Sequence, residues 1–228
     1  MKKGVWLGLI LVFALIVLSA ACSQTANNEH SGMNQNEMNH NAMNHNSMPV
    51  NSNMPMNSNH MNQMQSDANA AGAPFDLQFI DTMTVHHEGA VRMAEMVLKN
   101  SQNDELKKFA RNIIDAQTEE NLRMKDWREK WYTGKPAAKN MEMPGMADSM
   151  KQPMTKDHME KMEGMTGKEF DLNFLDMMIP HHEGAIKMAK AAQEKAEHAE
   201  LKTLAGQIIK AQEAEIKQMD DWKAQWSK

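Results

Sequence analysis

The chain has 228 residues, of which 30 are acidic and 25 are basic, and this mildly acidic balance without a basic cluster leads us to expect no nucleic acid partner. Its single cysteine, Cys22, excludes an intramolecular disulfide and a cluster of thiolate metal ligands. The 25 methionines, against one tyrosine and six phenylalanines, exceed what an ordinary core requires.

The first 21 residues have the pattern of a signal peptide. Lys2 and Lys3 precede an unbroken apolar run over residues 5–18, and small residues then lead into Cys22. A cysteine directly after such a cleavage site is typical of a bacterial lipobox. We therefore predict that residues 1–21 are removed, that Cys22 is lipidated, and that the exported, extracytoplasmic chain is anchored to the cell membrane by lipid. Secretion without lipid and an uncleaved membrane anchor are the alternatives.

Residues 22–73 form an arm that is rich in Asn, Met, Ser and His. We predict that it is disordered, because it has almost no aliphatic residues and its methionines recur at a step of five, which suits neither helix nor strand. Three roles stay open: a spacer, a multivalent collector of soft metal ions, or a sink for oxidants. Histidines favour the collector, because oxidant scavenging does not use imidazole. The methionines at this step are Met33, Met38, Met43 and Met48, and the histidines are His30, His40, His45 and His60.

Two later segments are copies of one another. Residues 75–131 and 170–226 align without a gap at an offset of 95, with 26 identities in 57 pairs. We therefore predict a duplicated unit, with one copy in residues 74–134 and the other in residues 168–228. The linker between them, residues 135–167, is rich in methionine and interrupted by proline and glycine, and we expect it to be disordered like the arm.

Each copy is predicted to form two helices. In the first copy, apolar residues at steps of three and four run over residues 79–97 and again over residues 106–131. A polar turn at residues 100–104 separates them, and its counterpart in the second copy should lie near His198, which we expect to be exposed. Neither hairpin can bury its apolar stripes alone. The sequence thus predicts an all-α fold, a four-helix bundle made of two tandem antiparallel hairpins.

Polar side chains interrupt the apolar stripes at matching places in both copies. His86 and Gln117 lie at similar distances on either side of the turn, so an antiparallel hairpin brings them to one level. His87 lies about 100° further around the helix, so we expect it at the margin of the core. Burying such groups without partners costs about 1–3 kcal/mol each, which indicates a ligand between the helices. The auxiliary groups that could hold an imidazole or join the ligands are Gln117, Glu120, Gln212 and Glu215.

Imidazole beside thioether is a donor set for soft or borderline metal ions. Met83 lies three residues before His86 and four before His87, so it can share a helix face with either ring. Thioethers favour Cu(I) and Ag(I), whereas zinc sites rarely use methionine. We therefore predict that the bundle binds copper as Cu(I), with Ag(I) as a surrogate. The alternative is that the methionines only fill the core.

The motif around the two His-His-Glu triplets, residues 86–88 and 181–183, resembles that of the bacterial family known as domain of unknown function 305. Residues 177–185, Met-Met-Ile-Pro-His-His-Glu-Gly-Ala, match it most closely. The resemblance implies an extracytoplasmic, ferritin-like helical bundle, and some members of the family are implicated in copper binding and copper tolerance. The metal ligands that it implies for this chain are Met83, His86, His87, Met93, Met178, His181, His182 and Met188.

We expect a binding protein, not an enzyme, that sequesters copper outside the cytoplasm in copper tolerance or homeostasis and can exchange it with a partner protein. A di-iron bundle oxidase is one alternative. That class needs several inward glutamates and a Glu-x-x-His pattern, whereas this chain has Gln117 and Glu120 at the same spacing. A structural surface lipoprotein with a Met-rich oxidant sink is the other alternative, and it predicts no change in stability when metal is added.

Overall fold

The computed structural model describes residues 65–151 and 156–228. The predicted signal peptide, Cys22 and the arm up to residue 64 lie outside these residues. The elements are η1 (Ala70–Gly72), α2 (Phe75–Asn100), α3 (Asp104–Tyr132), α4 (Met146–Lys151), α5 (Lys156–Glu163), α6 (Gly167–Lys195) and α7 (Ala199–Trp226). The described part of the chain contains no strand, which agrees with the all-α prediction. None of its helices is both long and apolar enough to cross a membrane.

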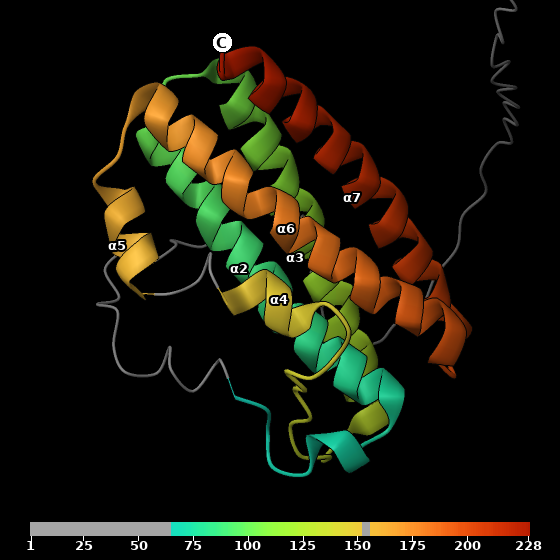
Figure 1. Cartoon of the computed structure of the whole chain (residues 1–228). Coiled ribbons are helices and arrows are strands. Elements are labelled where there is room, and N and C mark those ends of the chain that lie inside the picture. Colours follow the sequence, from blue (N-terminus) through green and yellow to red (C-terminus); the bar gives the residue numbers. More distant parts are fainter. Residues whose placement is uncertain (1–64, 152–155) are drawn as a thin grey trace, which may run out of the picture. The chain divides into compact units, whose positions relative to one another are not determined.

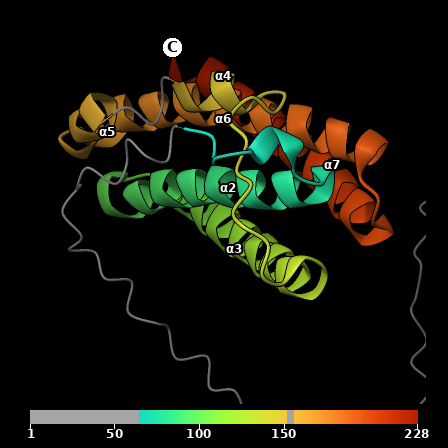
Figure 2. The ribbon, with the colours of Figure 1, turned by 90° about the horizontal axis from the view of Figure 1, so that it is seen from below.

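The long helices form a bundle of two antiparallel hairpins, as predicted. α2 pairs with α3 and α6 pairs with α7 (Figure 1), and the hairpins form two layers that meet through α2 and α6 (Figure 2). The first half of α2 shares one core cluster with the second half of α6, and the remaining halves share another cluster. α2 and α6 therefore run antiparallel, which places their middle residues opposite each other.

The predicted turns separate the helices of each hairpin, and local chemistry explains the first of them. The side chain of Asn103 accepts the backbone N–H groups of Glu105 and Leu106, so it caps the start of α3. In the second copy, α6 ends at Lys195 and α7 begins at Ala199. The second turn has no such side-chain cap.

The second turn is held instead by the other hairpin. The buried carboxylate of Asp76 accepts the backbone N–H groups of Glu197 and His198 over 2.9–3.2 Å, and the Nδ1–H of His198 over 2.7 Å. The His198 ring stacks on Trp131. The expectation that His198 is an exposed turn residue is therefore wrong: its side chain is only 32% exposed, because it joins the two hairpins.

The expectation of a disordered linker is also wrong for the part of it that the structure describes. Met143, Met146 and Met162 are buried in the core clusters, since flexible thioether side chains fill its irregular edges. Polar side chains of α2 bind the linker backbone: Asp81 accepts the N–H of Ala138, and Thr82 accepts the N–H of Asn140. The end of the arm is attached as well, because the backbone N–H of Asp67 donates to the carbonyl of Lys139.

Candidate metal centre

Two imidazoles lie against each other where α2 and α6 pack together, and each has a second imidazole beside it in the sequence. The ring centroids of His86 and His181 lie 3.7 Å apart, and each ring lies 6.4 Å from that of its sequence neighbour, His87 or His182. All four side chains are fully buried. The expectation that His87 lies at the margin of the core is wrong, because the position faces the contact between α2 and α3, where Glu120 covers it.

Carboxylate groups lie beside the Nε2 atoms of two of these rings, those of His87 and His182. His182 Nε2–H donates to Glu215 Oε2 over 2.8 Å. His87 Nε2 lies 2.8 Å from Glu120 Oε2, although this contact does not meet hydrogen-bond geometry. A carboxylate beside Nε2 favours the tautomer that carries its proton there, which leaves the Nδ1 lone pair free. Glu120 and Glu215 therefore orient the rings, one of the two roles expected for them.

The linker supplies a contact that the sequence patterns do not predict. The hydroxyl of Ser149, in α4, lies 3.0 Å from His86 Nε2 and donates its own hydrogen to the carbonyl of Met146. Ser149 Oγ must then accept from His86 Nε2–H, so Nδ1 of His86 also keeps its lone pair. The sequence signal that points to Ser149 is the glycine at position 184, inside α6, because a helical glycine indicates that another segment approaches closely.

Several ring nitrogens of the four histidines are buried and lack a hydrogen-bond partner in the described part of the chain. Nδ1 of His86, His87 and His182, and both ring nitrogens of His181, are buried without hydrogen-bond partners among the described residues. Burial lowers the pKa of His86 and of His181 well below the usual histidine range, and the neighbouring imidazoles lower it further. These rings are thus neutral at pH 7 and can donate to a metal ion. Leaving each such atom unpaired costs about 1–3 kcal/mol, so the donor set suits a bound ion better than an empty core.

The candidate methionines fall into two core clusters, each of which contains one methionine from each hairpin. Met83 of α2 and Met188 of α6 belong to one core cluster, while Met93 of α2 and Met178 of α6 belong to the other. All four are fully buried. They lie on the same stripes as the histidines, on both sides of them along each helix.

The predicted auxiliary amides are buried in the bundle. Gln117 and Gln212 are 3% exposed, and Oε1 of each has no hydrogen-bond partner among the described residues. In residues 65–151 and 156–228, no three His, Cys, Asp or Glu side chains converge in a way that could hold a metal ion. The candidate centre therefore depends on combining imidazole with thioether donors.

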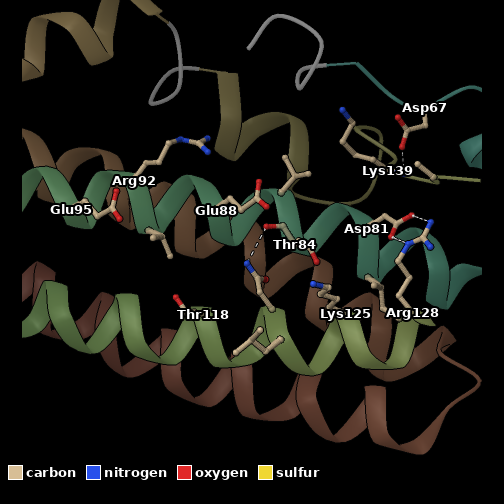
Figure 3. Close-up of a pocket in the computed structure, with 16 residues that line it drawn as sticks. Asp67, Asp81, Thr84, Glu88, Arg92, Glu95, Thr118, Lys125, Arg128 and Lys139 are labelled. Atoms are coloured by element: carbon tan, nitrogen blue, oxygen red, sulfur yellow. Dashed lines mark hydrogen bonds and ion pairs between the residues drawn. The ribbon is translucent and has the colours of Figure 1, made fainter. Parts of the chain in front are cut away.

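A groove of about 720 Å³ lies elsewhere, on the outer face of α2 and α3 (Figure 3). Its polar lining includes the ion pair of Arg128 with Asp81, at 2.8 Å. In the same lining, the backbone carbonyl of Thr84 accepts a hydrogen bond from the side chain of Asn121. None of the four buried histidines lines this groove. Asp81, in the lining of this groove, helps to attach the linker. The groove is separate from the histidine centre.

We expect Gly184→Ala to displace α4 from the histidine centre. A Cβ atom at Gly184 would overlap the side chain of Ser149 and lie 2.7 Å from the carbonyl oxygen of Gly145. Because both obstacles belong to a tightly packed segment, the substitution should lower the free energy of unfolding by about 1–3 kcal/mol. It should also break the hydrogen bond between Ser149 and His86. Urea unfolding and the ¹⁵N shifts of the His86 ring measure the two effects.

Gly206→Ala is the matched control. The nearest atom to a Cβ there is the end of the Gln193 side chain, at 3.1 Å, which can move away. Alanine also raises helix propensity by about 1 kcal/mol, so the control should be at least as stable as the wild type. If Gly184→Ala is as stable as this control, the close contact between α4 and α6 does not exist.

Comparisons with known proteins agree with the fold. Domain of unknown function DUF305 matches residues 18–120 and 76–223. A DUF305 protein from Streptomyces coelicolor is 29% identical, with 70% of this chain and 95% of that chain covered and a TM-score of 0.61. A DUF305 fragment from Deinococcus radiodurans is 25% identical, with 67% and 97% covered and a TM-score of 0.57. No curated protein matches the chain significantly.

A third similar structure is CopM in its Cu(I)-bound form. It is 36% identical to this chain, with 66% of this chain and 96% of that chain covered and a TM-score of 0.55. CopM has also been solved in Cu(II)-bound and Ag-bound forms. Since the family match extends over most of the sequence and CopM shares more than a third of its residues over the aligned part, the chain belongs to the DUF305 family.

Proposed function

We propose that this chain binds and sequesters copper outside the cytoplasm, as Cu(I), in copper tolerance or homeostasis. The observation that carries the proposal is the cluster of four fully buried imidazoles whose Nδ1 atoms have no partner among the described residues. The copper-bound and silver-bound forms of CopM, a relative of similar fold, support it. Nothing in the proposal requires the chain to be an enzyme.

The ligands that we propose are drawn from the two hairpins together. His86 and His181 are the central donors, because their rings are adjacent and their neutral form is favoured by burial. His87 and His182 are oriented by carboxylates, an arrangement that strengthens imidazole ligands in other metal sites. Thioether sulfur then adds the preference for Cu(I) and Ag(I). The proposed set is Met83, His86, His87, Met93, Met178, His181, His182 and Met188, with Gln117, Glu120, Gln212 and Glu215 around it.

We further propose that the chain is exported and held at the membrane through lipid on Cys22. The support is the signal-like sequence of residues 1–21 and the fact that the Streptomyces coelicolor relative is described as a candidate secreted protein. In this location the Met-rich arm could collect copper for the bundle, which could then exchange it with a partner protein.

Anaerobic titration tests the proposed function. The full, metal-free chain is titrated with Cu(I) and with Ag(I) against a competing chelator, with Zn(II) as the control ion. We expect at least one tightly held Cu(I) or Ag(I) per chain, weaker retention of zinc, and a higher melting temperature on loading. An ion present at 100 times its Kd stabilises the folded state by about 2.7 kcal/mol. Identical melting of loaded and metal-free samples, with no bound ion found, would leave a structural lipoprotein as the better account.

A further inference from the structure

The two ends of the bundle are built from equivalent residues but differ in the contacts at their turns. At the offset of 95 between the copies, Asp76 corresponds to Asp171 and Trp131 corresponds to Trp226. His198, which lies between Asp76 and Trp131, corresponds to Asn103. The same position of the duplicated unit therefore carries an imidazole in the second copy and no imidazole in the first.

At the first end, the imidazole lies between a carboxylate and an indole. His198 Nδ1 lies 2.7 Å from Asp76 Oδ2, and the ring stacks on Trp131 with centroids 3.7 Å apart and planes 9° from parallel. Trp131 stacks in turn on Trp127, at 5.3 Å. The result is a stack of three flat rings whose last member donates a hydrogen bond to a buried carboxylate.

At the second end, no described side chain takes the place of that imidazole. Asn103 uses its side chain to cap α3, by accepting the N–H groups of Glu105 and Leu106. Trp226 stacks on Trp222 at 5.3 Å, which repeats the indole pair of the first end, and the ring stack ends there.

The carboxylate at the second end is also incompletely paired. Asp171 is 6% exposed, and its Oδ1 has no hydrogen-bond partner among the described residues. Burial raises the pKa of this carboxyl group, while a hydrogen bond from Ser101 and the charge of Lys107 lower it. An unpaired, buried carboxylate oxygen is unfavourable, so a donor supplied from outside would be stabilising.

A hollow of about 570 Å³ opens beside these two groups. Its wall includes both Asp171 and Trp226, together with polar side chains that can tolerate a polar ligand. The remaining lining residues are Gln102, Asn103, Gly167, Lys168 and Gln225.

We propose that this hollow binds an imidazole ring, with a ring N–H donating to the carboxylate of Asp171 and the ring face stacked on Trp226. The ring would occupy the position that His198 takes at the other end. Lys168 in the lining and Lys107 near Asp171 disfavour a permanent cation such as guanidinium, whereas neutral imidazole has the required N–H donor. The ring can come from a histidine of the arm of the same chain or from a different polypeptide. The inference does not depend on copper binding.

The test follows the indole N–H signal of Trp226 in the full, metal-free chain, with a chelator present. The signal is assigned by its loss in Trp226→Phe. Added imidazole should shift it to saturation with a stoichiometry of one, and the indole signal of Trp131 should not move. Asp171→Asn removes the charge on the acceptor and should weaken imidazole binding about tenfold or more.

A sharper test exchanges the side chains at the two positions that differ, Asn103 and His198. Asn103→His should place an imidazole on Trp226 and abolish binding of added imidazole, while it also removes the side-chain cap of α3. His198→Asn should open a second hollow at Trp131, so that the Trp131 signal now also responds to imidazole. Circular dichroism checks that both variants stay helical, and Asn103→Gln serves as a control that fills space without a ring.

Three results would overturn the inference: a Trp226 signal that does not respond to imidazole in the wild type, equal binding in Asp171→Asn, or unimpaired binding in a folded Asn103→His. Deletion of residues 27–64 then identifies the source of the ring. If a histidine of the arm occupies the hollow, the deletion shifts the Trp226 signal and strengthens binding of added imidazole. If the signal is unchanged, no histidine of the arm occupies the hollow.

Discussion

Replacing His181 and His182 together by alanine is expected to abolish the tightest copper site. The pair supplies two of the four imidazoles of the candidate centre. One of them, the ring of His181, lies against His86 and has no hydrogen-bond partner at either nitrogen among the described residues. Changes to groups that merely orient a metal ligand cost about 10–100-fold in affinity. Removal of two proposed ligands should therefore lower the Cu(I) affinity by about 100-fold or more, measured anaerobically against a competing chelator.

The matched control removes the same number of imidazoles from the arm. His40→Ala with His45→Ala should leave the tight site intact, and deletion of residues 27–64 should reduce only the number of weakly bound ions. Far-UV circular dichroism must show that the bundle variant remains helical, because two buried side chains have been truncated. If the folded bundle variant keeps both the affinity and the metal content of the wild type, the assignment of the site to the bundle is wrong, even if the chain binds copper.

Internal duplication made much of this centre predictable. The steps of three and four in the apolar stripes, repeated at an offset of 95, identify the long helices and place both histidine pairs at the middle of their hairpins. A hairpin that cannot bury its own stripe must pair with the other, and this pairing brings His86 to His181. The contact of Glu120 with His87 is close to what the same reasoning predicts, since Glu120 lies about one helical turn from Gln117, which the hairpin places level with His86.

The remaining features depend on contacts that no periodic pattern specifies. His87 is buried, although its angular position suggests the margin, because a third surface, that of α3, covers it. Ser149 reaches His86 from a segment whose composition resembles a disordered linker, and only the small size of Gly184 makes that approach possible. The difference between His198 and Asn103 is visible in the sequence, but its consequence depends on how Asp76 and Asp171 lie against the turns of the opposite hairpins.

The metal-free chain should lose stability as the pH falls from about 6.5 towards 5. Burial holds the pKa of His86 and of His181 well below the ordinary histidine value of about 6.5, so the folded state does not bind a proton that the unfolded chain binds. Above pH 6.5 both states hold these rings neutral, and the free energy of unfolding should not depend on them. Below it, the unfolded chain binds more protons, and each ring can cost up to about 1.4 kcal/mol per pH unit. For the two rings together, the slope approaches about 2.7 kcal/mol per pH unit.

Urea unfolding between pH 8 and pH 5, with a chelator present, measures this slope. His181→Gln should reduce this slope by about half, because it removes one of the two buried imidazoles whose pKa is lowered in the folded state. His60→Gln removes an imidazole from the arm and should leave the slope as it is in the wild type. A free energy of unfolding that is flat over this range, or that rises as the pH falls, would mean that the central rings accept protons in the folded state. A centre that protonates so easily could not keep its nitrogen lone pairs available to copper in mildly acidic solution.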